Sequence, residues 1–210
     1  MGKPRATHQL PKSWPENILY LTNTVFSKAV SPNALKTTNS DLNSDAKTVS
    51  NTKGPSSLVK IIEIKDPGHP AKGQHGLFAA QQLYPDTLIL FYLGYVHGSS
   101  DADPNSDYDL CLDRELGIGV DASKMGNEAR FINDFRGVTV SPNAEFRDVW
   151  VDIGKSIFEK RIAVYVLPVG KSGKRAKGIA KGEEILVSYG KGFWKERERE
   201  KHVDIGSECG

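Results

Sequence analysis

The sequence predicts a mostly β (α+β) protein with small strands and little helix. After residue 57 the chain consists of short apolar runs rich in β-branched and aromatic residues, which is typical of strands. Glycine and proline residues separate these runs, as expected of turns. Hydrophobic residues make up 38% and charged residues 26% of the 210 residues, a composition typical of a globular protein.

Residues 1–57 are predicted to form an N-terminal extension. They hold seven basic and three acidic residues, a net charge of +4, whereas the remainder carries −2. Ser13 and Glu16 form a candidate capping box, and the apolar residues that follow favour a helix over 14–29. We expect this helix to dock on the main domain, with a partner-binding helix as the alternative. Residues 31–57 lack aromatic side chains and are rich in Ser, Thr, Asn and Lys, which predicts a flexible linker.

The main domain is predicted over 58–194, followed by a short C-terminal helix and tail over 195–210. Its strands are expected, in chain order, at 58–64, 88–96, 108–113, 118–121, 149–153 and 161–169. Only Lys124–Phe131 and Phe193–Lys201 have a helical pattern, and opposite charges three residues apart support the second helix.

Several functional classes are disfavoured by composition. Cys111 and Cys209 are too few for a disulfide framework or a thiolate zinc cluster, which indicates an intracellular protein without a structural metal. A formal net charge of +2 gives no support for sequence-specific nucleic-acid binding. No apolar run reaches the ~18 residues that a membrane span requires. The Gly170-Lys171-Ser172 sequence lacks the opening glycine and the helix of a phosphate-binding loop.

An ordered series of motifs remains. Its segments are QHGLFA at 74–79, FYLGYV at 91–96, GNEARFIN at 126–133, SPN at 141–143 and KGEEILVSYG at 181–190. In this order and spacing the chain resembles the SET-domain protein lysine methyltransferases over residues 58–194. The resemblance implies S-adenosyl-L-methionine as the methyl donor and a lysine side chain as the acceptor. It also implies small curled sheets and a C-terminal pseudoknot in which the Asn133 and Tyr189 segments cross.

The resemblance also implies roles for individual residues. Tyr189 matches the catalytic tyrosine of the family, and Tyr108 is expected to be a second catalytic residue. Cofactor binding is expected from Tyr189 and from Gln74, His75, Gly76, Arg130, Asn133, Asp134 and Trp194. For Arg130 a structural role is the favoured alternative, and Trp194 is an alternative anchor for the helix after it. A lysine stem is a thin apolar rod, so an aromatic channel is expected from Tyr92, Tyr95, Phe135 and Phe193.

Some positions differ from the family pattern. Asp134 and Phe135 stand where the family has His-Ser, and Val187 and Ser188 stand where it has Tyr-Asp. Plant enzymes that monomethylate the histone H3 tail also replace the residues after this asparagine. The favoured hypothesis is an active methyltransferase acting on a basic protein, a histone tail or nucleosome in the nucleus, which the acidic loop 101–109 would attract. The alternative is a catalytically silent SET module that binds a peptide or acts as a scaffold.

Overall fold

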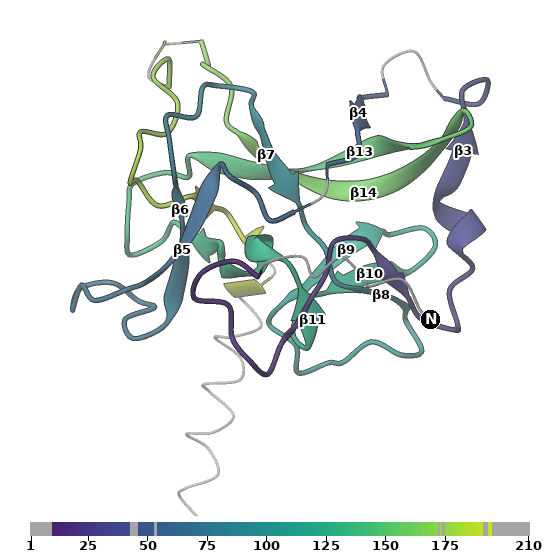
Figure 1. Cartoon of the computed structure of the whole chain (residues 1–210), viewed down its shortest axis with the longest axis horizontal. Helices are drawn as coiled ribbons and strands as arrows, with labels where there is room; N and C mark the ends of the chain where they lie inside the picture. The colour runs from purple at the N-terminus through teal and green to yellow at the C-terminus, as the bar shows by residue number, and fades with distance from the viewer. Residues whose placement is uncertain are drawn as a thin grey trace, which may run out of the picture.

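The computed structural model describes residues 10–42, 46–52, 54–171, 173, 175–190 and 193–194. It is mostly β, as the sequence predicts, and is built from small sheets arranged around a shared interior (Figure 1). No helix in this described part is long and apolar enough to cross a membrane.

The largest sheet is built on a long hairpin of β13 (Ala144–Gly154) and β14 (Ile157–Val166). Lys155 and Ser156 connect the two strands with φ values of 57° and 56°. Two successive left-handed residues are typical of a type I′ turn, whose twist matches that of the flanking strands. β3 (Lys36–Thr38) and β7 (Leu88–Phe91) pair with β14, and β4 (Thr48–Ser50) pairs with β13. The strands predicted at 149–153 and 161–169 therefore belong to one longer hairpin.

A four-stranded sheet and a two-stranded sheet lie beside the large sheet. The four-stranded sheet has the order β2 (Val25–Phe26), β8 (Tyr95–Gly98), β10 (Ile118–Asp121) and β9 (Asp109–Asp113). The other sheet pairs β5 (Val59–Glu63) antiparallel with β6 (His75–Ala79). The predictions at 58–64, 108–113 and 118–121 are confirmed by these elements.

The strand predicted over 88–96 is divided between two sheets. β7 lies in the large sheet and β8 in the four-stranded sheet, and the chain passes between them at Tyr92–Gly94. A Cβ at Gly94 would lie 2.5 Å from the backbone oxygen of Asp121. The close approach of these two backbones explains why the connection requires glycine.

The helix predicted over 14–29 is wrong. This segment forms turns and the two-residue strands β1 (Leu19–Tyr20) and β2, and Ser13 has a left-handed φ of 66° that a helix cap does not adopt. Leu19 is 60% exposed, so the apolar residues of this segment do not form one buried helical face. Pairing of β1 with β11 (Met125–Gly126) and of β2 with β8 outweighs the local helical pattern.

The linker predicted over 31–57 is also wrong for its described residues. It contains a 3₁₀ helix, η1 (Pro32–Leu35), and the strands β3 and β4 on the two sides of the β13–β14 hairpin. Leu35 is 1% exposed and belongs to the main core. Backbone hydrogen bonds to a preformed sheet order a segment whose own composition is too polar to fold alone.

One of the two helices predicted after residue 57 is shorter than expected, and most of the other lies outside the described residues. Within Lys124–Phe131 only η2 (Glu128–Phe131), a 3₁₀ turn, is helical, because β11 occupies the preceding residues. Most of the helix predicted at 193–201, and all of the segment 195–210, lies outside the described residues.

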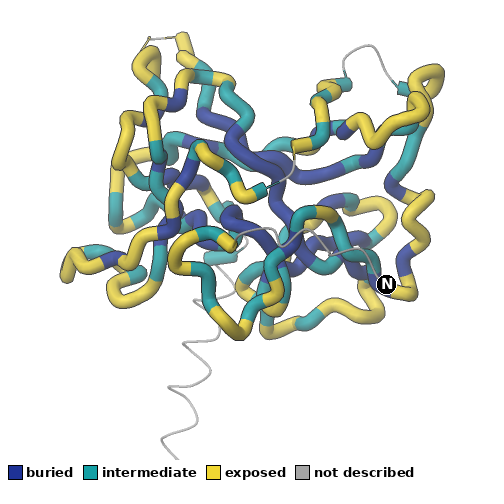
Figure 2. Tube along the Cα trace, in the orientation of Figure 1, coloured by how far each residue is buried: buried dark blue, intermediate teal, exposed yellow. Residues whose placement is uncertain are grey.

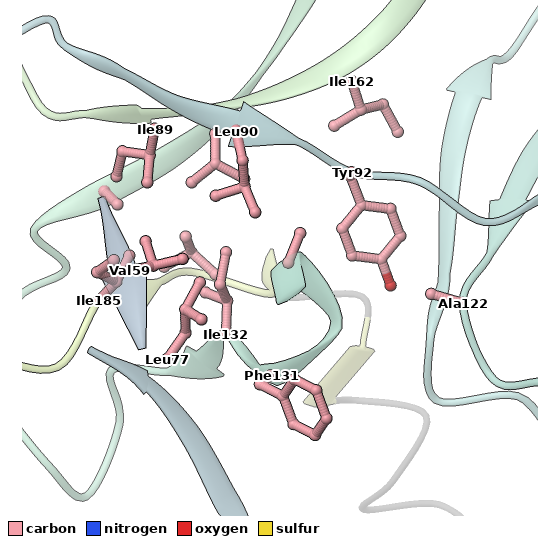
Figure 3. Packing of buried hydrophobic residues seen from close by; sticks show 14 of the residues in the cluster. Val59, Leu77, Ile89, Leu90, Tyr92, Ala122, Phe131, Ile132, Ile162 and Ile185 are labelled. Atoms are coloured by element: carbon pink, nitrogen blue, oxygen red, sulfur yellow. The ribbon is translucent and has the colours of Figure 1, made fainter. Parts of the chain in front are cut away.

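The predicted crossing of the two motif segments is present. β12 (Asn133–Asp134) pairs in parallel with β15 (Leu186–Val187), with Asn133 opposite Leu186 and Asp134 opposite Val187. Buried chain runs through the middle of the molecule and meets these strands (Figure 2). Around them Leu77, Ile132 and Ile185 pack with Ile89 and Leu90 of β7 (Figure 3). The pseudoknot is therefore fixed by the main hydrophobic core.

Candidate functional site

Two clefts lie side by side at the pseudoknot. The first cleft has a volume of about 640 Å³ and is bordered by the N-terminal segment, the β5–β6 connection and the pseudoknot. The second cleft has a volume of about 440 Å³ and lies over β9 and η2. Both volumes fall in the range of about 300–1,000 Å³ typical of small-molecule sites.

Most of the predicted site residues line these clefts. Those in the first cleft are Gln74, His75, Tyr108, Arg130, Asn133, Asp134, Tyr189, Phe193 and Trp194. Those in the second cleft are Tyr92, Tyr108, Arg130, Tyr189 and Phe193. Tyr108, Arg130, Tyr189 and Phe193 border both clefts, which places the junction at the predicted catalytic tyrosine.

Tyr189 is held at this junction by its hydroxyl group and its ring. The hydroxyl donates a hydrogen bond to the backbone oxygen of Ile132 at 2.6 Å, and the ring meets Phe193 edge to face at a centroid distance of 5.0 Å. Burial, with nearby acidic groups, raises the pKa of Tyr189 well above its usual value. The phenol therefore stays protonated at neutral pH.

Tyr92 has a similar role on the second cleft. It extends from the end of β7 toward Ala122 (Figure 3), and its hydroxyl donates to the backbone oxygen of Tyr108 at 2.7 Å. Burial raises the pKa of Tyr92 as well. This hydrogen bond fixes the backbone of Tyr108, whose side chain borders both clefts.

Arg130 packs against residues at the junction of the two clefts. Its Nε donates to the backbone oxygen of Ala122 at 3.0 Å, and its guanidinium lies 4.4 Å from the ring centre of Tyr108. The sequence left open a structural role and a cofactor-binding role for Arg130, and these contacts favour the structural role.

Asn133 is oriented by a buried network that the sequence did not reveal. Its Nδ2 donates to Glu184 Oε1 at 2.8 Å and to the His75 backbone oxygen at 3.4 Å. Glu184 Oε2 lies 3.0 Å from Nε2 of His69, and both side chains are less than 10% exposed. His69 and Glu184 are 115 residues apart, so no local spacing indicates that they meet.

The missing side chain at Gly76 leaves space for Glu184 of that network and not for the cleft. A Cβ on Gly76 would lie 2.5 Å from Glu184 Oε1. Gly76 is not among the residues that line either cleft, so its predicted contact with a cofactor is not seen in the described chain.

Tyr95 and Phe135 likewise do not line either of the two described clefts. Tyr95 lies on β8, opposite Asp121 on one side and Val25 on the other. The backbone N–H of Phe135 donates to Val187, and its ring lies 5.0 Å from the Arg136 guanidinium. Their expected place in a substrate channel stays a prediction.

The N-terminal segment forms a wall of the first cleft that the sequence also did not reveal. Pro15, Asn17 and Ile18 line this cleft. Trp14 fixes the segment, because its Nε1 donates to the Ile18 backbone oxygen at 2.7 Å and its ring packs edge-on against Phe131. Because the sequence predicted a helix over 14–29, it did not indicate that this segment lines the first cleft.

The SET domain family matches residues 74–190, which is more than half of the chain. The chain belongs to the SET-domain family. This SET domain is 28% identical over 165 residues to histone-lysine N-methyltransferase set-2 of Caenorhabditis elegans, a match that covers 74% of the chain and 9% of that protein. The predicted family and the predicted SET fold are thereby confirmed.

Solved structures also resemble this SET domain. A humanized mutant of the Chaetomium thermophilum Polycomb Repressive Complex 2 bound to the inhibitor GSK126 matches with 22% identity and a TM-score of 0.49, over 65% of this chain and 15% of that one. The structure of ctPRC2 in an autoinhibited conformation bound to S-adenosylmethionine matches with 23% identity and a TM-score of 0.46, over 68% of this chain and 17% of that one. The chain therefore spans less than a fifth of the length of each of these relatives.

Proposed function

We propose that this SET domain is a protein lysine N-methyltransferase that transfers a methyl group from S-adenosyl-L-methionine to a lysine side chain. The observation that supports this most strongly is the junction of two clefts at Tyr108, Tyr189 and Phe193. A donor in one cleft and an acceptor in the other would meet there. Direct methyl transfer needs no covalent intermediate, so holding the two reactants in line is the main task of the protein.

The donor is assigned to the first cleft. With the Asn133 amide nitrogen bonded to Glu184 and His75, its amide oxygen is left to accept a bond from the ammonium group of a donor. His75 and Gln74 border the same cleft at the start of β6, and Trp194 offers an indole face for an adenine ring. S-adenosyl-L-methionine supplies the activated methyl group when it is bound.

The acceptor lysine is assigned to the second cleft. Its apolar stem suits the rings of Tyr92, Tyr108 and Phe193, and a nearby sulfonium with apolar surroundings lowers the pKa of the lysine amine. The Tyr189 hydroxyl donates its hydrogen bond to the Ile132 backbone oxygen, so its own oxygen can accept a bond from the amine and aim the lone pair at the methyl group. Because the phenol is not ionised, it orients the amine and does not remove its proton.

A basic peptide is the proposed substrate, with a histone tail in the nucleus as the first choice. Asp103, Asp107 and Asp109 border the second cleft, where they favour approach of a Lys- or Arg-rich chain. Hydrogen bonds from Asn105 and Lys124 lower the pKa of Asp103, which keeps it charged at neutral pH.

Calorimetry with S-adenosyl-L-methionine tests the proposal. We expect binding by the wild-type chain and, for Asn133→Ala, affinity weakened about tenfold or more, because the variant loses a polar partner of the ligand's charged group. Asn105→Ala, an exposed loop variant, is the control and should bind normally. Histones incubated with labelled donor should then gain methyl groups detectable by mass spectrometry. Absence of donor binding by the wild-type chain would favour the silent scaffold instead.

A further inference from the structure

The Asp134 carboxylate accepts hydrogen bonds from three residues beside the first cleft. Its side chain is only 4% exposed. Oδ2 accepts from the Tyr189 backbone N–H at 2.7 Å and from Trp194 Nε1 at 3.3 Å. Arg136 donates through its backbone N–H at 2.9 Å and through Nη1, which reaches the two carboxylate oxygens at 3.0 and 2.8 Å. Charge-assisted bonds of this kind are shorter and stronger than neutral ones.

Two of these partners have side chains in the wall of the first cleft. Arg136 and Trp194 both line it, and the Arg136 guanidinium lies 5.7 Å from the Trp194 ring centre. Trp194 meets Phe193 edge to face at 5.4 Å, and Phe193 meets Tyr189 at 5.0 Å. A continuous set of contacts thus connects Asp134 to the ring of the candidate catalytic tyrosine.

We infer that Asp134 is a positioning residue: its carboxylate holds Trp194 and Arg136 against the pseudoknot, so that the wall of the first cleft is formed before the donor binds. The inference rests on the proposed function, because it assigns that cleft to S-adenosyl-L-methionine. An arginine and a tryptophan that must be ordered during binding reduce affinity, and ordering them beforehand removes that cost. Asp134 therefore acts through its neighbours, whereas Asn133 faces the ligand.

The test compares wild type with the isosteric variant Asp134→Asn in the full chain labelled with fluorotryptophan. The chain has three tryptophans, so Trp194→Phe assigns the Trp194 resonance in the fluorine NMR spectrum and Trp150 on β13 reports on the fold. Without ligand, we expect Asp134→Asn to shift and broaden the Trp194 resonance while the Trp150 resonance stays in place. Affinity for S-adenosylhomocysteine, measured by calorimetry, should weaken about tenfold, as expected when a hydrogen bond to a charged group is lost.

Asp121→Asn is the matched control. Asp121 is also a buried aspartate, 8% exposed, but it bonds Ser106 and Ser123. Its replacement should leave the Trp194 resonance and the affinity for S-adenosylhomocysteine unchanged.

The possible outcomes separate this inference from the proposed function. An unchanged Trp194 resonance in Asp134→Asn, or a changed resonance with unchanged affinity, overturns the inference. If Asp134→Asn also moves the Trp150 resonance, the fold has changed and the variant Arg136→Met is used instead. Arg136→Met must shift the Trp194 resonance alone and weaken S-adenosylhomocysteine binding, and failure to do so overturns the inference.

If wild type does not bind S-adenosylhomocysteine, the proposed function fails, and the positioning of a donor fails with it. If wild type binds and Asp134→Asn binds equally well, only the inference fails.

Discussion

At the scale of single residues, the junction of the two clefts depends on hydroxyl groups that bond to backbone oxygens. Tyr189 donates to Ile132 at 2.6 Å and Tyr92 donates to Tyr108 at 2.7 Å. Each hydroxyl proton is used inside the protein, so each oxygen faces a ligand only as an acceptor. Burial raises the pKa of both phenols and so preserves this arrangement at neutral pH.

Tyr189→Phe removes the acceptor oxygen and keeps the ring. We expect donor binding close to that of wild type, whereas methyl transfer should fall about 10²-fold or more, the usual cost of removing one oriented polar group from a reaction site. Calorimetry and initial rates with labelled donor measure the two effects. Tyr165→Phe is the matched control, because the Tyr165 hydroxyl is buried and, within the described chain, has no hydrogen-bond partner. Equal turnover by wild type and Tyr189→Phe would contradict the assigned role.

His97 is predicted to make stability depend on pH. Its Nδ1 lies 3.0 Å from the Gly98 backbone oxygen and its Nε2 lies 3.0 Å from Asp109 Oδ1, so both ring nitrogens face acceptors, which favours the doubly protonated ring. Burial by itself opposes the charge, but the hydrogen bonds to Gly98 and Asp109 outweigh it and raise the pKa of His97. A raised pKa in the folded state stabilises the protein fully below the unfolded value of about 6.5 and loses that effect as pH rises through the folded value.

Urea unfolding at a series of pH values checks this prediction. Between pH of about 6.5 and the folded pKa, the free energy of unfolding of wild type should fall relative to that of His97→Gln, which lacks the titrating ring. Parallel pH profiles for the two proteins would show that folding does not shift the pKa of His97, which contradicts the prediction.

At the scale of elements, a strand is predicted correctly where its own apolar residues match the buried position that it occupies. Ile118–Asp121 is buried along its whole length and was predicted with its observed bounds as β10. The run 88–96 shows no sequence sign of its division, because Gly94 marks a close approach to Asp121 that only the fold reveals. β1 and β2 are two residues long and lie in a segment with a helical pattern, and β3 and β4 lie in a polar segment. All four are ordered by pairing with strands remote in the sequence.

Leu35→Ala tests whether this N-terminal segment is integral to the fold. Leu35 is 1% exposed, and truncating a buried leucine to alanine costs about 2–5 kcal/mol in the free energy of unfolding. Leu116→Ala, at a leucine that is 54% exposed, is the control and should change that free energy by less than about 0.5 kcal/mol. Urea unfolding measures both values. An effect of Leu35→Ala as small as the control would restore the linker interpretation.

At the scale of the whole molecule, the site combines segments that the sequence keeps far apart. Asn133 and Tyr189 were predicted from motif resemblance; both line the first cleft, and Tyr189 also borders the second. The partnership of His69 with Glu184 follows only from the pseudoknot, which brings the β5–β6 connection against the C-terminal motif. Family motifs thus identify residues that line the candidate site, whereas the contacts that orient them join segments that are remote in the sequence.

The acidic border of the second cleft leads to a prediction about the whole charge distribution. Asp103 and Asp107 border the cleft in which the acceptor is proposed to bind. Because the Debye length falls from about 30 Å at 0.01 M salt to about 8 Å at 0.15 M, we expect kcat/KM for a basic peptide to fall with salt. The KM for S-adenosyl-L-methionine should change less, because Asp103 and Asp109 line only the second cleft and Asp107 alone borders both.

A pair of double variants assigns that salt dependence to the cleft. Asp103→Asn with Asp107→Asn should flatten the dependence of kcat/KM on salt, because fewer charges then attract the peptide. Asp148→Asn with Asp152→Asn removes the same charge from β13, where neither residue lines the two clefts, and should retain the wild-type slope. Initial rates at several salt concentrations give the slopes. Identical slopes for the two double variants would mean that net charge, and not the border of the second cleft, attracts the substrate.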